Sequence, residues 1–375
     1  EDIENLISFL QTKPKLTQGE KVEEFEKKWS EWLGVKHSVF VNSGSSANLI
    51  SLAVLKQLVG GGDVIVPTLT WVSDIAAVLQ NGFQPKFIDI DLKNLCMKPE
   101  DIIKSINAET KAVFMTYAQG FNGLTDELLE VFDKRNIILI EDVCESHGAT
   151  HNSKKLGTFG LISNFSFYYA HHMSTIEGGM VCTDDNDVYQ SLRMFRSHGL
   201  VRESTDEDIK TRYLGESNQL NSEFIFAFPA YNVRNTEIGA VIGLNQLQRL
   251  DENNKKRTDN FEYFIQSLDP EIFQTDFELE GSSNYAFNLI LNEKDFDLRN
   301  KIEKNLANHQ IEFRRGSAGG GNQLRQPYLK DYVSEGYWLQ FPNTEHIHHF
   351  GWYIGNYPDL EKNKIDQICS ILNNI

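Results

Sequence analysis

The chain alternates between short apolar runs and longer segments in which apolar residues recur at helical spacing. In the segment 22–33 (VEEFEKKWSEWL), charged residues lie between the apolar ones, and a glycine at position 34 ends the pattern. This arrangement indicates an amphipathic helix, and another is expected at the acidic N-terminus. The same criteria predict strands over 37–41, 63–67, 85–90, 112–116, 137–140, 163–168 and 179–183, and further helices over 49–58, 71–79, 99–106 and 126–135.

Strands that alternate with helices predict an α/β fold in which helices cover both faces of a mostly parallel sheet. The length of 375 residues favours one large domain and a smaller one, which we assign to 1–249, including the N-terminal helical segment, and 250–375. The segment 202–228 is polar and weakly periodic, so it is expected to be a long irregular excursion. The chain beyond it is expected to contain helices over 237–250, 253–268 and 297–309, strands over 285–291 and 311–314, and a glycine-rich loop over 316–322.

Composition narrows the possible functions. With 40% hydrophobic and 24% charged residues the chain can bury a large core. The formal net charge of −17 disfavours nucleic acid and anionic membranes as partners. The four cysteines lie far apart, which disfavours a disulfide scaffold or a zinc ribbon and fits the reducing cytoplasm. The apolar runs are shorter than the ~20 residues that a membrane helix needs, and no signal peptide is visible.

Two polar segments follow strands at positions where α/β sheets bind ligands. The segment 43–47 (SGSSA) lies between a strand and a helix, where it can hold a phosphate or act as an ordinary helix cap. Glu141 and Asp142 end an apolar strand, and a buried carboxylate there needs a cationic partner. A protonated pyridine nitrogen meets that need, and so does a structural arginine.

Adjacent histidines, His171 and His172, follow the strand expected at 163–168. Imidazole suits acid and base chemistry near neutral pH. Metal binding competes with this interpretation, but adjacent residues of an extended segment point to opposite sides. A second group at 346–349 contains three histidines and is more typical of surface or pocket histidines, so no metal site is predicted. The segment 231–234 (YNVR) can reach a ligand or cap the helix that follows.

In this order the segments resemble the DegT/StrS nucleotide-sugar aminotransferases, which are pyridoxal-phosphate-dependent enzymes of fold type I. The resemblance covers nearly the whole chain. It implies a large domain with a mostly parallel central sheet between helices, a smaller C-terminal α/β domain, and a homodimer. It also implies that the cofactor phosphate is held by Gly44, Ser45 and Ser166 with Asn232 of the partner subunit, that Trp71 stacks on the cofactor ring, that Asp142 pairs with the pyridinium nitrogen, and that Glu145 lies near the ring hydroxyl.

One departure from the family pattern changes the implied chemistry. Family aminotransferases place a lysine six residues before the glutamate of a G-E-G-G motif, and here that spacing from Glu177 reaches His171. The Schiff-base lysine is therefore absent, and pyridoxal or pyridoxamine phosphate must be held without a covalent bond. The branch with two histidines resembles the sugar 3-dehydratases, of which one kind acts on GDP-4-keto-6-deoxymannose and an iron-sulfur kind acts on a CDP-sugar. Both act in 3,6-dideoxysugar biosynthesis.

The resemblance implies His171 as the base, a nucleotide-linked 4-keto-6-deoxyhexose as substrate and an amino acid such as glutamate as amino donor. The segment 202–228 lacks the cysteines that an iron-sulfur cluster needs, which favours GDP, although the segment 321–328 (GNQLRQPY) is closer to the iron-sulfur kind. An aminotransferase that works without its lysine and a non-catalytic ligand-binding relative remain alternatives. The substrate-binding candidates are Arg314 and Arg315, which suit a diphosphate or are exposed strand-end charges, together with Asn322 and Arg325.

Overall fold

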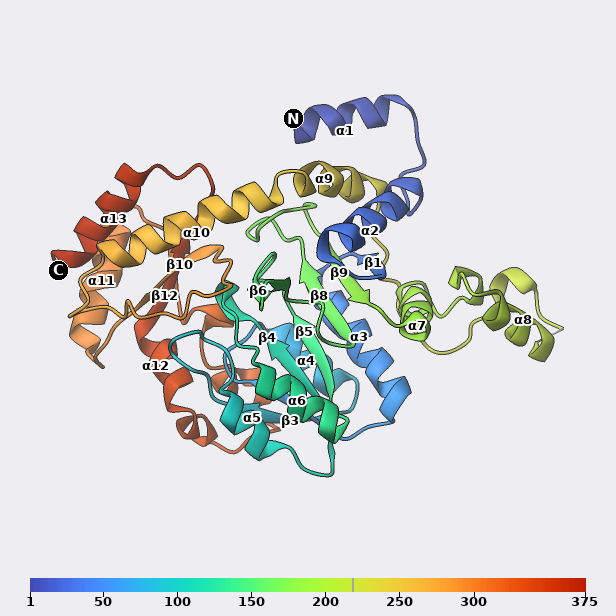
Figure 1. The fold of residues 1–375 in the computed structure, drawn as a ribbon, viewed down its shortest axis with the longest axis horizontal. Helices are drawn as coiled ribbons and strands as arrows, with labels where there is room; N and C mark the ends of the chain where they lie inside the picture. Colours follow the sequence, from blue (N-terminus) through green and yellow to red (C-terminus); the bar gives the residue numbers. More distant parts are fainter. Residues whose placement is uncertain (218) are drawn as a thin grey trace.

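A seven-stranded sheet forms the centre of the larger part of the molecule in the computed structural model, which describes residues 1–217 and 219–375 (Figure 1). The strand order is β1-β9-β8-β5-β4-β2-β3, in which the five strands from β8 to β3 are parallel and β9 is antiparallel to both neighbours. The predicted, mostly parallel sheet is confirmed. Its strands are β1 (His37–Val41), β2 (Asp63–Pro67), β3 (Gln84–Ile88), β4 (Thr110–Thr116), β5 (Ile138–Asp142), β8 (Ile162–Ser166) and β9 (Gly179–Thr183).

Helices cover both faces of this sheet, because its strands are apolar on both sides. Successive residues of β2 belong to different cores: Val64 and Val66 pack on one side of the sheet, and Ile65 packs on the other. The first core contains residues of α3, α4 and α7, and the second contains residues of α2, α5 and α6. These helices are α2 (Glu20–Leu33), α3 (Gly44–Val59), α4 (Val72–Gln80), α5 (Pro99–Ser105), α6 (Asp126–Arg135) and α7 (Asn186–Arg196).

A three-stranded antiparallel sheet, in the order β10-β12-β11, forms the second unit. The chain between β11 and β12 leaves this sheet, and its Leu324, Leu329 and Phe341 join the core around α3 and α4. The domain boundary at 249/250 stays a prediction; it falls where α10 begins. The elements of this part are α9 (Glu237–Leu247), α10 (Leu250–Ser267), β10 (Ala286–Ile290), α11 (Phe296–Asn308), β11 (Phe313–Arg315), α12 (Pro342–Phe350), β12 (Gly351–Gly355) and α13 (Lys362–Asn373).

The polar segment 202–228 projects from the body of the molecule (Figure 1). The expectation of an irregular excursion is wrong for part of it, because α8 (Glu207–Glu216) lies within it. Asp206 caps that helix by accepting hydrogen bonds from the amides of Asp208 and Ile209. None of the α8 residues is buried, so the segment lacks the apolar periodicity by which a helix is recognised. Position 218 of this segment lies outside the described residues.

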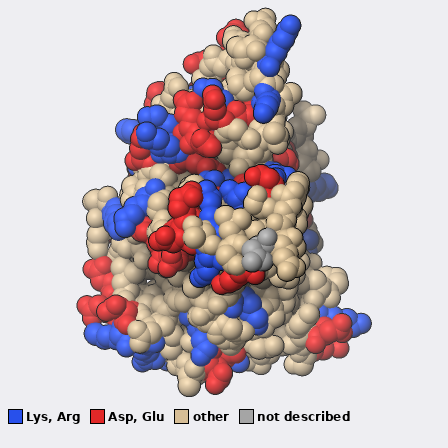
Figure 2. All heavy atoms as spheres, turned by 90° about the vertical axis from the view of Figure 1, so that its right-hand side faces the viewer, with Lys and Arg blue, Asp and Glu red and all other residues tan. Residues whose placement is uncertain are grey.

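Charges of both signs are interspersed over the face that carries α8 (Figure 2). On α8 itself Lys210 and Glu207 form an exposed pair at 2.8 Å, which is worth little to stability. Within the described residues, no helix is both long and apolar enough to cross a membrane. The remaining elements are α1 (Asp2–Gln11), the hairpin β6 (Thr150–His151) and β7 (Lys154–Lys155), and the 3-10 turns η1 (Ala118–Gly120), η2 (Val201–Glu203), η3 (Ser222–Phe224), η4 (Ala318–Gly320), η5 (Gln323–Arg325), η6 (Pro327–Leu329) and η7 (Tyr337–Gln340).

Candidate active site

A cavity of about 1290 Å³ opens at the carboxyl ends of the parallel strands and extends to the small sheet. Thr116 of β4, Asp142 of β5 and Ser166 of β8 line it at the strand ends, Gly44 lines it at the start of α3, and Tyr353 of β12 lines it from the small sheet. Ligands of open α/β sheets bind at this edge of the sheet. The cavity is therefore the candidate active site.

The start of α3 meets the end of β8 at one wall of the cavity. Ser43 caps the helix by accepting a hydrogen bond from the amide of Ser46 at 3.1 Å. A Cβ atom on Gly44 would lie 2.6 Å from the Cβ atom of Ser166, so only glycine allows this close approach. Gly44, Ser45 and Ser166 all line the cavity beside the helix N-terminus, a place that favours anions. The structure thus brings the predicted phosphate-binding residues together.

The two acidic residues at the end of β5 face different environments, because successive residues of a strand point to opposite sides. Glu141 is fully buried, and its carboxylate accepts hydrogen bonds from the amides of Gly157, Phe159 and Gly160. Asp142 lines the cavity, and its Oδ1 atom accepts a hydrogen bond from the Cys144 amide at 2.9 Å. Asp142 is therefore the carboxylate that a bound ligand can reach.

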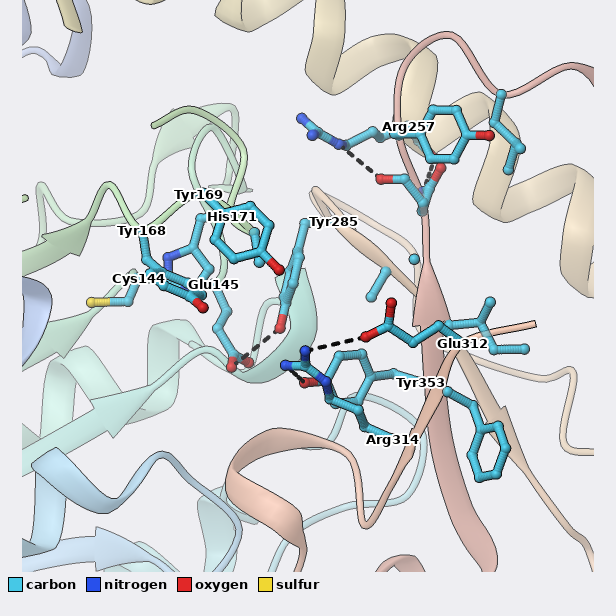
Figure 3. Close-up of a pocket in the computed structure, with 18 of the residues that line it drawn as sticks. Cys144, Glu145, Tyr168, Tyr169, His171, Arg257, Tyr285, Glu312, Arg314 and Tyr353 are labelled. Atoms are coloured by element: carbon cyan, nitrogen blue, oxygen red, sulfur yellow. Dashed lines mark hydrogen bonds and ion pairs between the residues drawn. The ribbon is translucent and has the colours of Figure 1, made fainter. Parts of the chain in front are cut away.

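The adjacent histidines also diverge. His171 lines the cavity, its Nδ1 atom lies 3.3 Å from the carbonyl oxygen of Ser166, and its ring meets Tyr285 edge to face at 5.6 Å (Figure 3). Burial lowers the pKa of the His171 imidazole, which leaves it neutral and able to accept a proton. His172 turns into the core, where its Nε2 atom donates to the carbonyl oxygen of Ser283 at 2.8 Å and its ring stacks on His147.

Glu145 and Tyr285 form a polar pair beside His171 (Figure 3). The Tyr285 hydroxyl lies 3.4 Å from Oε1 of Glu145, and the backbone amide of Gln119 donates a hydrogen bond to Oε2 at 2.7 Å. Burial raises the pKa of the Glu145 carboxyl to about 7. Glu145 can therefore hold or release a proton near neutral pH.

Aromatic side chains lie at the open side of the cavity. Trp71, at the cap of α4, lines the cavity and is 55% exposed. Tyr168 and Tyr169 also line it, and both are exposed (Figure 3). Trp71 and Asp142 thus line the same cavity, and stacking of Trp71 on a bound ring stays a prediction.

The two adjacent arginines predicted to bind the substrate, Arg314 and Arg315, lie in different places. Arg314 lines the cavity, held by Glu312 at 3.3 Å and by the Tyr353 hydroxyl at 3.4 Å (Figure 3). Arg315 is not among the cavity residues of the described chain; it pairs with Glu303 at 3.2 Å. The alternation of side chains along β11 explains this difference.

Three further candidates lie away from the cavity in the described part of this chain. Arg325 forms a two-point pair with Glu345, at 2.8 and 2.6 Å, and the Asn322 side chain donates to the same carboxylate at 2.9 Å. Asn232 is exposed, and its Oδ1 atom accepts a hydrogen bond from Arg234 at 3.1 Å. Asn322 and Arg325 are therefore held in place by the same carboxylate, that of Glu345. A ligand contact by Asn322, Arg325 or Asn232 stays a prediction.

Sequence reasoning missed Tyr285, Tyr353 and Arg257, which also line the cavity. The tyrosines lie at the start of β10 and in β12, where an aromatic residue is typical of any strand, so the sequence carries no signal for them. The histidines of α12 have local partners: His346 contacts the carbonyl oxygen of Leu291 at 2.6 Å. No group of three or more potential metal ligands is found in residues 1–217 and 219–375.

The family model of the DegT/DnrJ/EryC1/StrS aminotransferase family matches residues 1–373. The chain belongs to this family. The predicted resemblance is thus confirmed, and so is the fold that it implies. GDP-4-keto-6-deoxy-D-mannose 3-dehydratase of Escherichia coli O55:H7 is 33% identical over 362 residues, which cover 95% of this chain and 92% of that protein.

Solved structures of this family match the whole chain. One is GDP-4-keto-6-deoxymannose-3-dehydratase with a trapped PLP-glutamate geminal diamine, at a TM-score of 0.88 and 31% identity, covering 99% of this chain and 97% of that chain. Another is a histidine-to-asparagine mutant of the same enzyme with bound GDP-perosamine, at a TM-score of 0.87 and 32% identity, covering 99% and 97%. The likeness includes the whole of both units described above.

Proposed function

We propose that this protein is a pyridoxal/pyridoxamine-phosphate-dependent 3-dehydratase that removes the C3 hydroxyl of GDP-4-keto-6-deoxymannose in 3,6-dideoxysugar biosynthesis. One observation carries the proposal. The cavity is lined by His171 together with Gly44, Ser45, Trp71, Asp142, Glu145 and Ser166, and the resemblance implies that His171 stands in place of the family's lysine and that the others hold the cofactor. Imidazole moves protons near neutral pH but forms no Schiff base with the cofactor. The two dehydratase structures and the 33% identical relative support this substrate and this cofactor.

The residues of the cavity fit pyridoxal phosphate. The space beside Gly44, which a Cβ atom would fill, lies at a helix N-terminus that suits the phosphate. Asp142 faces the cavity with a carboxylate that no described Lys or Arg neutralises, which suits a protonated ring nitrogen. Trp71 presents an aromatic face. The bound group supplies an electron sink for cleavage of the C3–O bond.

The protein side of the reaction follows from His171 and Glu145. The His171 Nδ1–H group donates to the Ser166 carbonyl, so Nε2 carries the free lone pair and accepts a proton. The same atom returns a proton to the C3 hydroxyl, which leaves as water when the C3–O bond breaks. Glu145, with a pKa of about 7, supplies or takes a proton on the Tyr285 side. Hydrolysis then gives ammonia and a 3,6-dideoxy-4-ketosugar. The nitrogen of the ammonia and the two electrons that replace the C3–O bond by a C3–H bond come from the amino donor, which leaves as its 2-oxo acid.

Glutamate is the proposed amino donor, as the PLP-glutamate adduct of the relative suggests. A homodimer is proposed because Asn232 is exposed outside the cavity of its own chain, and Trp71 and Tyr169 are exposed at the cavity mouth. The cytoplasm is the proposed location, since all four cysteines are free thiols.

Product analysis tests the function. Protein loaded with pyridoxal phosphate and glutamate is given GDP- and CDP-linked 4-keto-6-deoxy sugars, and ammonia and sugar mass are measured. We expect stoichiometric ammonia and loss of one oxygen from the GDP-sugar. An accumulating aminosugar would instead identify an aminotransferase that works without its lysine. Absence of both cofactor binding and turnover would identify a non-catalytic relative. A His171→Lys variant shows what a restored amine changes.

Arg314 and Arg315 offer a matched pair of variants for the diphosphate. Arg314→Ala is expected to raise the KM for the nucleotide sugar roughly 10- to 100-fold, because hydrogen bonds to charged groups contribute about 1.5–3 kcal/mol. Arg315→Ala is expected to leave KM nearly unchanged, since that side chain pairs with Glu303 outside the cavity. Steady-state kinetics of both variants measure the two KM values. Equal KM values for the two variants would show that Arg314 does not bind the substrate.

A further inference from the structure

Asp74 is a buried carboxylate that the proposed mechanism does not use. It lies in the first turn of α4 and has no exposed surface. Its Oδ2 atom accepts hydrogen bonds from the hydroxyls of Thr116, at 2.6 Å, and Thr70. Its Oδ1 atom accepts a hydrogen bond from the Asn48 side-chain amide at 2.8 Å. Asp74 is not among the residues that line the cavity, so it meets no ligand directly.

The same nitrogen atom of Asn48 connects Asp74 to the cavity. Asn48 Nδ2 also donates to Oδ2 of Asp142 at 2.9 Å, so the two carboxylates converge on one amide group. The Asn48 Oδ1 atom is buried without a hydrogen-bond partner in the described structure. The opposite orientation of the amide would place this oxygen against both carboxylates. The carboxylates therefore determine how Asn48 is oriented.

Cationic side chains do not neutralise this pair. In residues 1–217 and 219–375 neither Asp74 nor Asp142 forms an ion pair with Lys or Arg. The titratable groups that face the pair are Cys144, Glu145 and His171 on the cavity side, and Tyr328 of η6. Burial, and then the charge of Asp142, raises the pKa of the Asp74 carboxyl well above its usual range. Because both carboxylates accept hydrogen bonds from the same Asn48 nitrogen, ionisation of Asp74 would place a second negative charge at this buried group.

We propose that Asp74 and Asp142 share one proton, and that Asp74 is a positioning residue that sets the charge and orientation of Asp142 toward the ring nitrogen of the cofactor. The second half of this inference rests on the proposed function, and the first half does not. With one proton the pair carries a single negative charge, which matches one pyridinium cation. When Asp74 ionises at higher pH, its added charge retains the ring-nitrogen proton.

The cofactor-free protein tests the shared proton. A carboxyl whose pKa is raised on folding makes the folded state less stable as pH rises from the unfolded pKa of about 4 toward the folded one. Denaturant unfolding of wild type and Asp74→Asn is compared between about pH 5 and pH 8.5. The ratio of folding constants, variant to wild type, is expected to rise roughly tenfold or more over this range. A constant ratio would overturn the shared proton. Asp74→Thr, which retains a hydroxyl, replaces the asparagine variant if that one does not fold.

Bound pyridoxal phosphate labelled with ¹⁵N at the ring tests the second half. The ring-nitrogen chemical shift is followed against pH in wild type, Asp74→Asn and Ser73→Ala; Ser73 contacts the same Asn48 nitrogen without carrying a charge. We expect the ring nitrogen to lose its proton about one pH unit lower in Asp74→Asn, and Ser73→Ala to follow the wild type. Coinciding curves for Asp74→Asn and wild type would overturn the positioning role. Failure of the wild type to bind the cofactor would overturn the proposed function and this role, while the unfolding experiment still decides the shared proton.

Discussion

Replacing His171 with Asn is expected to lower the rate of dehydration on the order of 10²–10⁴-fold, the range that a positioned general base contributes. Asparagine fills a similar space beside Ser166 but accepts no proton at the position of Nε2. Because His171 is proposed to handle the proton both before and during loss of the C3 hydroxyl, we expect the upper part of this range. Single-turnover formation of the deoxysugar, with the cofactor spectrum recorded in parallel, measures the effect and shows that the cofactor is still bound.

His172→Asn is the matched control for this experiment. His172 is buried, donates to the Ser283 carbonyl and stacks on His147. Its replacement is expected to lower the free energy of unfolding by about 1–3 kcal/mol, because a buried carbonyl loses its donor. The folded fraction is expected to turn over at nearly the wild-type rate. Comparable rate losses in the two folded variants would show that the wrong histidine has been assigned as the base.

Periodicity predicted most of the fold because the inner strands of the large sheet are buried on both faces, although the edge strand β3 exposes Gln84 and Lys86. Residues 63–67 (DVIVP) illustrate this, since they are buried throughout and could only belong to a covered strand. The same criterion failed for α8, which buries none of its residues and begins at the cap that Asp206 provides. It also missed α12, β12 and α13. Because β12 follows directly on α12, no polar break marks the boundary between those two elements.

The candidate site could be predicted where a residue's position along the chain decides its role. Asp142 ends a buried strand, and His171 stands at a defined spacing from Glu177, so the sequence predicts both as site residues, and both line the cavity. Tyr285 and Asp74 could not be found in this way. Each reaches the site through packing between elements far apart in the sequence, as when Asp74 meets Asn48 and Thr116.

Only one of the three arginines predicted to bind the substrate lines the cavity, and the ion pairs that hold the other two could not be predicted from the sequence. Arg314 and Arg315 are adjacent, yet only Arg314 lines the cavity. Arg325 is held by Glu345, twenty positions further along the chain, and this pair fixes the loop that carries Asn322. Arg314 also has a carboxylate partner, Glu312, but both side chains of that pair are more than half exposed, whereas Arg325 and Glu345 are largely covered. Arg314 is therefore the better candidate for a diphosphate.

Replacing Asp142 with Asn is expected to lower turnover on the order of 10²–10³-fold, the effect of removing one preorganised electrostatic group from an active site. The substitution removes the negative charge that is proposed to face the ring nitrogen and leaves the shape of the side chain nearly unchanged. Burial is the main cause that raises the pKa of Asp74, and the substitution removes the second cause, which is the charge of Asp142. The loss of stability with rising pH is therefore expected to shrink, and near pH 8 the cofactor-free variant should be about 1 kcal/mol more stable than the wild type.

If Asp142→Asn is slower and yet more stable than the wild type, the loss of rate comes from the missing charge and not from damage to the fold. Glu141→Gln supplies the contrast, because Glu141 lies on the other side of β5 and accepts hydrogen bonds from three amides. A glutamine leaves some of those donors unpaired, so we expect a loss of about 1–3 kcal/mol in unfolding free energy and little change in the rate of the folded protein. Denaturant unfolding and turnover measured on both variants give the comparison. Asp142→Asn losing both stability and rate would mean that Asp142 supports the strand end rather than the cofactor, because removal of one of two neighbouring buried carboxylates relieves repulsion in the cofactor-free protein.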